Sequence, residues 1–280
     1  SSVYLLLILS RPGIEMKNLP SNIPQYSAVW GTYVPNDALL FGFENYTAIH
    51  QYNASYPKQY TILINIPELG LKLRPAAIDS VLTVSFAVPN ESIAFAFVNQ
   101  AAFDNFTSAL TGYSSARVPA GNNSMYYVQD LQSGNLVFGW LGIMPADRGI
   151  AFAIGSSDAK QALMSCLALS PANAMITQLN IRQMLYVANG TAGHLALGIQ
   201  HFKGVLPAAN STLTAINVVG SRVQINRILQ FNSTDTAVSQ YDNVKTSYLS
   251  AHVFAVYNAF VLATEYQALS DVSGAVRLVE

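Results

Sequence analysis

Charged side chains are scarce in this sequence. Only 10% of its 280 residues are Asp, Glu, Lys or Arg, whereas an ordinary soluble domain carries about 25%. The 14 basic residues are scattered singly along the chain, and they form no basic stripe of the kind that nucleic-acid binding requires. We therefore expect no nucleic-acid partner. Disorder is also excluded, because disordered chains are poor in aromatic residues and this sequence contains 11% of them.

Cysteine occurs only once, and long apolar runs are absent. Cys166 is the only cysteine, so no disulfide bond can form within a chain that is long enough to fold on its apolar core alone. The longest apolar run covers residues 3–9, whereas a membrane-spanning helix needs about 20 consecutive apolar residues. We expect no transmembrane segment. The sequence begins at Ser1 rather than at a methionine, as expected of a processed chain.

Known signatures of catalysis and of cofactor binding are absent. The sequence contains no G-x-S-x-G nucleophile elbow, no glycine-rich phosphate-binding loop and no calcium-binding EF-hand loop. His194 and His201 lie seven residues apart on one predicted strand, which places them on opposite faces. Cys166 lies in the apolar stripe of a predicted helix, as a buried structural thiol would. We expect no catalytic residue, no cofactor and no metal ion.

Glu44 and Glu265 are the two carboxylates that could act as a pair, as in glycoside hydrolysis, because each lies beside apolar strand sequence. Glu44 also lies at a strand-to-helix junction, where a carboxylate interacts with the helix dipole. Glu265 could face solvent near the end of a strand. The sequence favours these structural roles over a secreted enzyme that acts on glycans.

The sequence is rich in N-glycosylation acceptors. The pattern Asn-X-Ser/Thr occurs eight times, whereas random placement of 21 Asn among 40 Ser and Thr residues gives about three. The acceptors are Asn45, Asn53, Asn90, Asn105, Asn122, Asn189, Asn210 and Asn232. We expect several of them to carry N-linked glycans, which would hydrate a surface with few charges. The alternative is that these residues gather in turns and helix caps for backbone reasons.

Strand patterns of period two alternate with helix patterns of period 3.6 along the chain. An apolar strand followed by a capped helix recurs five times, beginning at Ala38, Ile93, Gly149, Val223 and Phe254. Further strands are predicted at residues 60–66, 81–88, 125–129, 136–143, 184–187, 194–202 and 213–219. The order of elements matches the split βαβ motif. We therefore predict an α+β fold of two tandem ferredoxin-like domains, whose antiparallel sheets carry helices on one face.

The predicted domain boundaries follow from this order. Residues 1–25 would form an apolar N-terminal strand and a tether, and residues 26–131 the first α+β domain. Residues 132–148 would form a linker or hairpin, because Gly134, Pro145 and Gly149 interrupt the pattern there. Residues 149–280 would form the second α+β domain.

The N-terminal segment reads SSVYLLLILS and is followed by Arg11-Pro12-Gly13. It is the remnant of a signal sequence, an internal strand buried on both faces, or a strand donated to a neighbouring subunit. A donated strand would place the subunit contact at Val3, Tyr4, Leu5, Leu6, Leu7, Ile8 and Leu9. A head-to-tail contact of this kind that does not close produces a filament.

The apolar segment at residues 3–9, the eight acceptors and the low charge together resemble archaeal cell-surface glycoproteins that build extracellular filaments, such as threads and bundling pili. The resemblance implies a β-rich sandwich with a donated N-terminal strand, which is the alternative to the α+β fold. It also implies an extracellular, self-assembling protein.

Together these features predict a secreted, N-glycosylated, non-enzymatic structural subunit of a filament, a pilus-like fibre or a surface layer. Its partners would be other copies of itself and its N-linked glycans. The first alternative is a secreted adhesin or a module that binds carbohydrate or protein. Aromatic residues are enriched at interfaces, and the tyrosines that could form such a surface are Tyr126, Tyr127, Tyr241, Tyr248, Tyr257 and Tyr266.

Overall fold

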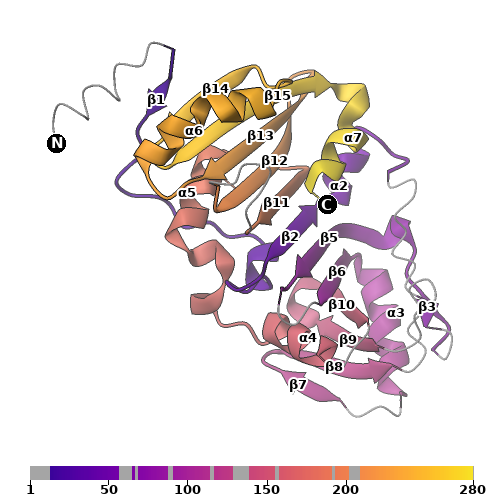
Figure 1. Ribbon diagram of the computed structural model, residues 1–280. Helices are drawn as coiled ribbons and strands as arrows, with labels where there is room; N and C mark the ends of the chain where they lie inside the picture. Colours follow the sequence, from indigo (N-terminus) through magenta and orange to yellow (C-terminus); the bar gives the residue numbers. More distant parts are fainter. Residues whose placement is uncertain are drawn as a thin grey trace. The chain divides into compact units, whose positions relative to one another are not determined.

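The computed structural model describes residues 13–56, 65–66, 69–87, 91–113, 117–128, 139–154, 158–190, 193–201 and 209–279. The chain divides into two compact units. We call residues 28–175 the middle unit, and residues 1–27 with 176–280 the terminal unit. Figure 1 shows the elements of both units with their labels.

The middle unit is built on an antiparallel sheet with the strand order β2-β5-β6-β10-β9-β8-β7. Its strands are β2 (Leu40–Glu44), β5 (Ile78–Ser85), β6 (Ser92–Val98), β7 (Val118–Ala120), β8 (Asn123–Val128), β9 (Gly139–Met144) and β10 (Gly149–Ile154). A separate short ladder joins β3 (Asn65–Ile66) to β4 (Leu71–Lys72). The helices are α2 (Tyr46–His50), α3 (Gln100–Thr111) and α4 (Ala159–Leu167), of which α4 packs on β9 and β10 and α2 on β5.

The terminal unit has the strand order β1-β14-β15-β13-β12-β11. Its strands are β1 (Met16–Lys17), β11 (Ala196–Gln200), β12 (Ser211–Val219), β13 (Arg222–Gln230), β14 (Val253–Tyr257) and β15 (Phe260–Ala268). Only β1 is parallel to its neighbour, β14, and the other pairs are antiparallel. The helices are α5 (Leu179–Val187), α6 (Thr234–Ser247) and α7 (Val272–Val276).

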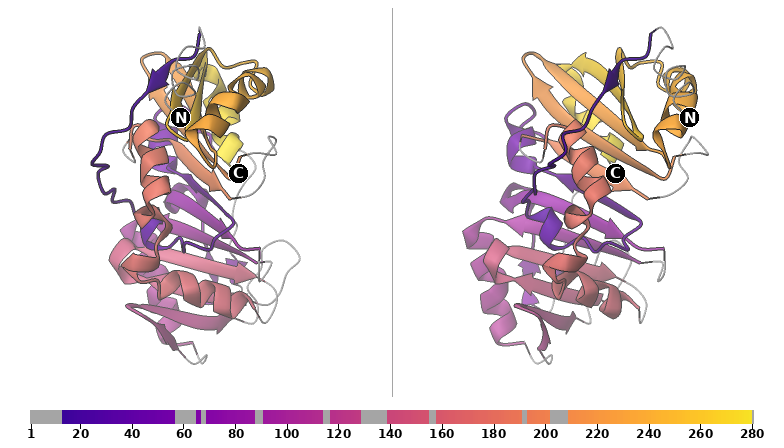
Figure 2. Two further views of the ribbon diagram at one scale, coloured as in Figure 1. Left: turned by 60° about the vertical axis from the view of Figure 1, so that its left-hand side comes forward. Right: turned by 90° about the vertical axis from the view of Figure 1, so that its left-hand side faces the viewer.

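Helices cover both faces of the sheet in the terminal unit (Figure 2). Leu229 of β13 belongs to the apolar core beneath α6. The next residue, Gln230, points to the opposite face because side chains alternate along a strand, and there it accepts a hydrogen bond from Asn180 of α5. The prediction that the helices cover one face only is therefore wrong for this unit.

The two units repeat one topology. In each unit three strands lie side by side in chain order, a helix follows the third, and a later pair of strands is placed so that its second strand lies against the third. In the terminal unit this series is β11-β12-β13-α6-β14-β15, and α7 follows it. In the middle unit β2-β5-β6, α3 and β9-β10 take the same places, with α4 at the end. Here α2, β3 and β4 are inserted between β2 and β5, and β7 and β8 between α3 and β9.

The α+β class with mostly antiparallel sheets is confirmed. The tandem ferredoxin-like arrangement is not confirmed. In the terminal unit the β-α-β-β-α series begins with β13, and the strand on the other side of β13 from β15 is β12, which precedes this series in the chain. In the middle unit β6 takes the place of β13, and β5 precedes it. The split βαβ motif takes that strand from after the second helix. The β-rich sandwich also differs from the structure, since helices rather than a second large sheet pack on the sheet of each unit.

The division of the chain differs from the predicted boundaries. The linker predicted at residues 132–148 contains β9, and the break at Pro145 is the turn between β9 and β10, in which Arg148 has a φ of 50°. Because β10 pairs with β6, it belongs to the middle unit, which extends to residue 175. Glycine and proline mark a hairpin turn and a linker alike, which is why the sequence did not separate the two.

One predicted strand is wrong, and a second is described only in part. Residues 184–187 belong to helix α5 rather than to a strand. The buried residues Ile181, Met184 and Leu185 follow helical spacing, but four residues are too few to distinguish a helix from a strand. Residues 65–66 of the strand predicted at 60–66 form β3, and residues 60–64 lie outside the described residues. None of the helices in the described ranges is long and apolar enough to cross a membrane.

Candidate functional site

The predicted glycan acceptors lie at the surface of both units. Asn90 falls outside the described residues, and none of the other seven is buried. Asn105, Asn122, Asn189, Asn210 and Asn232 are exposed, and Asn45 and Asn53 are half-buried. An amide nitrogen that carries a glycan must be reachable from solvent, because the sugar is bulky and hydrated. Burial therefore excludes a glycan at none of the seven described positions when each is taken by itself.

Local backbone geometry explains three of these residues without a glycan. Asn45 caps helix α2, and its Oδ1 accepts a hydrogen bond from the Ala48 N–H at 3.0 Å. The Asn53 Oδ1 accepts from the Ser55 N–H at 3.1 Å, and Asn189 has a φ of 69°, which Asn tolerates better than most residues. The two side-chain bonds use the amide oxygen, whereas a glycan attaches to the nitrogen. A local structural role and a glycan are thus compatible.

Two acceptors meet in the terminal unit although they are far apart in the sequence. The Asn210 Nδ2 donates a hydrogen bond to the Asn232 Oδ1 at 2.6 Å. Asn210 lies directly before β12 and Asn232 shortly after β13, and these two strands pair with each other. The hairpin ladder therefore brings the two acceptors side by side.

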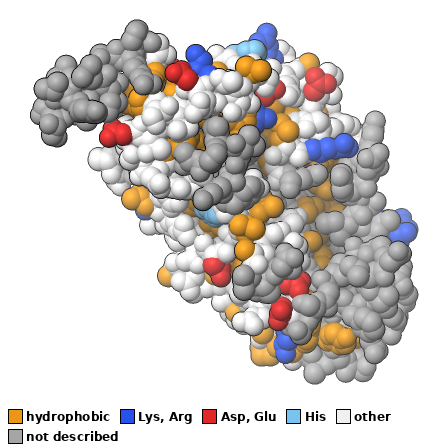
Figure 3. Space-filling view, in the orientation of Figure 1, with side chains coloured by type: hydrophobic (Ala, Val, Ile, Leu, Met, Phe, Trp, Pro, Cys, Tyr) orange, Lys and Arg blue, Asp and Glu red, His pale blue; other side chains and the backbone are white. Residues whose placement is uncertain are grey.

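Few charged side chains appear on the face shown in Figure 3, where the red and blue areas are small and lie among uncharged and apolar ones. One exposed ion pair joins Lys17 to Glu15 at 3.0 Å, and such pairs contribute little to stability. Large apolar side chains also reach the surface, with Leu249 82% and Leu179 56% exposed. The sparse charge in the sequence is thus also a property of the described surface.

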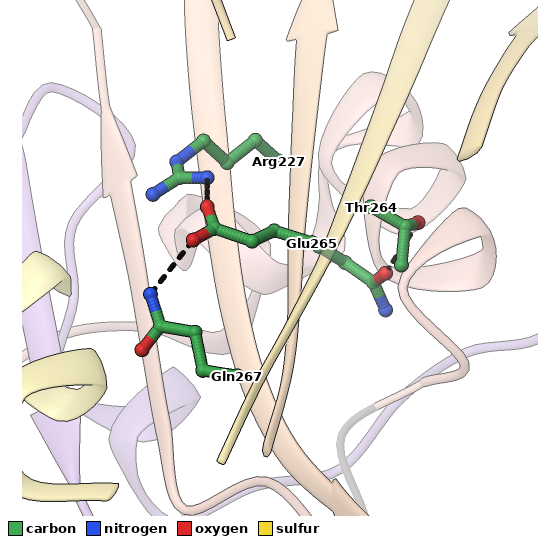
Figure 4. A network of polar contacts seen from close by, with 5 residues as sticks. Arg227, Thr264, Glu265 and Gln267 are labelled. Carbon is green, nitrogen blue, oxygen red and sulfur yellow. Dashed lines mark hydrogen bonds and ion pairs between the residues drawn. The ribbon is translucent and has the colours of Figure 1, made fainter. Parts of the chain in front are cut away.

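Glu265 belongs to a buried polar network in the terminal unit (Figure 4). The Arg227 Nη1 donates to its Oε2 at 2.9 Å, and the Gln267 Nε2 donates to its Oε1 at 2.7 Å. Burial alone would raise the pKa of the Glu265 carboxyl, but these hydrogen bonds and the Arg227 charge hold the pKa below its usual value. Arg227 also lies 5.3 Å from the centroid of the Tyr248 ring. The ionised Glu265 carboxylate, held by Arg227 and Gln267, thus links β13 to β15. It is a poor proton donor.

Glu44 lies in the middle unit, so the two candidate carboxylates belong to different units. It is 8% exposed, and the Tyr56 hydroxyl donates to its Oε2 at 2.8 Å. Each carboxylate is therefore held by a partner of its own unit, and nothing in the described geometry favours the carboxylate pair of a glycan-active enzyme.

His194 and His201 belong to the terminal unit and Cys166 to the middle unit, and each has a structural role. The His194 Nε2 lies 2.8 Å from the Gly190 carbonyl oxygen, and the His201 Nδ1 lies 2.8 Å from the Ser211 Oγ. Cys166 is fully buried in α4, and burial raises the pKa of its thiol, which keeps it in the unreactive protonated form. No group of three or more potential metal ligands gathers within the described ranges.

A cleft of about 470 Å³ lies in the middle unit beside the first half of helix α3. Its lining includes Lys72 and Arg74 together with Asn99 and Asn105. A glycan on Asn105 would therefore start at a cleft that two cationic side chains also line.

The predicted subunit-contact residues Val3, Tyr4, Leu5, Leu6, Leu7, Ile8 and Leu9 lie outside the described residues. The described chain that follows them is anchored at the edge of the terminal sheet. Ile14 and Met16 pack against the core beneath α6, and the Val256 N–H donates to the Glu15 carbonyl oxygen at 2.9 Å. Strand β1 pairs with β14 at two residues only. The apolar segment thus leads into a sheet edge, which the sequence alone did not reveal.

Comparisons with known proteins bear on the fold. No family model matches the sequence, and no curated protein matches it. The structure of crystal form III of TP0453 aligns with a TM-score of 0.51 at 12% sequence identity, over 90% of this chain and 99% of that one. Crystal form I of TP0453 aligns with a TM-score of 0.49 at 11% identity, over 90% of this chain and 98% of that one. At such low identity the likeness concerns the fold alone.

Proposed function

We propose that this chain is a secreted, N-glycosylated, non-enzymatic structural subunit of an extracellular assembly, such as a filament, a pilus-like fibre or a surface layer. The supporting observation is that all seven described acceptors are accessible on a protein with only 10% charged residues. Glycans would supply the hydration that charged side chains supply in other soluble proteins. Its resemblance in type to archaeal surface glycoproteins supports the same proposal.

Subunit contact is the second part of the proposal. Residues 3–9 are apolar, and an exposed apolar strand is prone to aggregate. Burial of this strand in the sheet of a neighbouring copy would remove that hazard and join the copies through main-chain hydrogen bonds. Gly13, with a φ of 102°, follows Pro12 and turns the chain where this segment meets the body.

Two measurements on the native protein test this function. Glycopeptide mass spectrometry should find glycans on several acceptors, and negative-stain electron microscopy should show filaments or lattices. Enzymatic removal of the glycans should lower solubility, because few charges remain to hydrate the surface. A glycan-free protein that stays a discrete monomer at high concentration would overturn the proposal.

A second candidate is a secreted adhesin or binding module, and one aromatic cluster favours it. Tyr127 is 40% exposed, and its ring contacts the Trp140 ring at a centroid distance of 5.4 Å. The Lys160 Nζ lies 4.8 Å from the Trp140 centroid. Exposed aromatic rings bind sugars and protein partners by stacking. Binding to a glycan array that is lost in Tyr127→Ala would support this candidate, and unchanged binding would exclude this cluster.

We also propose that each unit is a variant of the ferredoxin-like domain. The order β13-β15-β14 around α6 supports this, because the first three strands of a split βαβ domain take the same order. Residues 28–175 form a continuous piece of chain. Expressed alone, this piece should unfold in one cooperative transition if it is a domain of its own. Aggregation without a cooperative transition would contradict the domain assignment.

A further inference from the structure

Asn210 and Asn232 lie too close together to carry independent glycans. The Asn210 Nδ2 is 2.6 Å from the Asn232 Oδ1, and the oxygen and nitrogen of one amide are about 2.3 Å apart. The two Nδ2 atoms therefore lie within about 5 Å of each other. Sugars attached to both nitrogens would overlap unless one side chain rotated and gave up the hydrogen bond.

The hydrogen bond distinguishes the two residues. Asn232 accepts through its oxygen and keeps its nitrogen for the sugar, whereas Asn210 donates through the nitrogen that a sugar would occupy. A glycan on Asn232 leaves this contact intact. A glycan on Asn210 replaces one hydrogen of the donor and places the sugar against the Asn232 amide.

The backbone around each acceptor favours the same residue. The Asn210 N–H donates to the Gln230 carbonyl oxygen at 2.8 Å, and the following Ser211 is 3% exposed and paired with Gln230. This acceptor sequence is therefore fixed in the sheet. Asn232 and Ser233 are both exposed and lie outside the strands, just before α6. An enzyme that transfers glycans reaches an exposed loop more easily than a paired strand.

We propose that Asn210 and Asn232 form one glycan site, in which Asn232 carries the glycan and Asn210 positions its amide. This inference rests on the proposed function, since it requires that the chain is glycosylated. The transfer joins the Asn232 Nδ2 to the anomeric carbon of a lipid-linked glycan. It breaks the bond from that carbon to the donor phosphate and releases one Nδ2 proton.

Two matched variants test the assignment without touching either asparagine. Thr212→Ala removes the acceptor sequence of Asn210, and Thr234→Ala removes that of Asn232. Intact mass spectrometry of the protein made in a glycosylating host should show no lost glycan for Thr212→Ala and one lost glycan for Thr234→Ala. Loss of a glycan in Thr212→Ala, or a glycan on both residues of one molecule, would overturn the inference.

A separate readout tests the positioning role of Asn210. In Asn210→Ala, an amidase that cleaves glycosylated asparagine should release the Asn232 glycan about fivefold faster, the factor that one neutral hydrogen bond contributes. The glycan at exposed Asn122 serves as the internal control and should be released at an unchanged rate. Equal release at Asn232 in both proteins would contradict the positioning role. If no acceptor is occupied in any protein, the proposed function itself fails, which is a different outcome.

Discussion

Arg227 and Glu265 lie diagonally across strands β13 and β15, with the Arg227 Nη1 2.9 Å from the Glu265 Oε2. Their side chains are only 14% and 9% exposed. Removing one partner from a buried ion pair costs about 3–5 kcal/mol, because the remaining charge stays buried and unpaired. We expect Arg227→Met to lower the unfolding free energy by about this amount, measured by urea denaturation. The double variant Arg227→Met/Glu265→Leu should recover most of the loss, and equal loss in both variants would contradict a charge effect.

The same carboxylate predicts a dependence of stability on pH. The pKa of Glu265 is lower in the folded protein than its usual value, so the folded state favours the ionised form. Its contribution is present above the unfolded pKa of about 4.3 and is lost as the pH falls through the folded pKa. We expect the unfolding free energy to fall on acidification below about pH 4.3, and less steeply in Glu265→Gln. Parallel pH profiles for the two proteins would argue against this role.

Tyr33 and Asp147 form a second long-range polar contact, in the middle unit. The Tyr33 hydroxyl donates to the Asp147 Oδ2, and Tyr33 is 3% exposed. Burial, this hydrogen bond and the Asp147 charge raise the pKa of Tyr33. Hydrogen bonds to charged groups contribute about 1.5–3 kcal/mol, so Tyr33→Phe should destabilise the protein by about this amount in thermal or urea unfolding. Tyr52→Phe, at a 41% exposed position, is the control and should have little effect.

Cys166 should be unreactive in the native protein. It is fully buried, and burial raises the pKa of its thiol. Because the thiolate is the reactive form, we expect Ellman's reagent to label no thiol under native conditions and one thiol per chain in guanidinium chloride. Rapid labelling of the native protein would show that α4 opens easily.

Deletion of residues 1–10 tests the proposed strand donation. We expect the shortened chain to stay folded, with an unchanged far-UV circular dichroism spectrum, because it keeps Ile14, Met16 and strand β1, which hold the described chain against the terminal sheet. Assembly should be lost in negative-stain images. A shortened protein that still polymerises would show that the copies are joined elsewhere.

Cross-linking distinguishes two placements of residues 3–9, burial in the sheet of their own chain and donation to another copy. Cys166 is buried, so single engineered cysteines can be cross-linked without interference. A batch of Leu6→Cys mixed with a batch of Val253→Cys should give cross-linked dimers if the donated segment lies along β14. Val219→Cys, at an exposed position of β12, is the matched control and should give none. A double variant that forms only an internal cross-link would show that the segment stays within its own chain.

Local sequence signals predicted much of the secondary structure. The strand predicted to begin at Ile93 is followed by a capped helix as expected, and the Asn99 side chain caps this helix, α3, by accepting a hydrogen bond from the Ala102 N–H. Such helices are predictable because the cap and the apolar stripe are contained in one short stretch of chain. Residues 184–187 were misassigned because four residues do not distinguish the two periods. Strand pairing was harder still, since it joins residues far apart in the sequence.

The sequence by itself determined the eight acceptor motifs, the shortage of charge and the single cysteine, because these are properties of the residues and not of their arrangement. Only the tertiary structure decided which acceptors meet, which carboxylate is paired and where each unit ends. Asn210 and Asn232 are 22 residues apart, and Arg227 and Glu265 are 38 apart. These pairs form because strand pairing brings distant stretches of the chain together. Arg227 and Glu265 lie diagonally across the β13–β15 ladder, and Asn210 and Asn232 lie just beyond one end of the β12–β13 ladder. The register of these ladders results from burial of apolar side chains over the whole sheet.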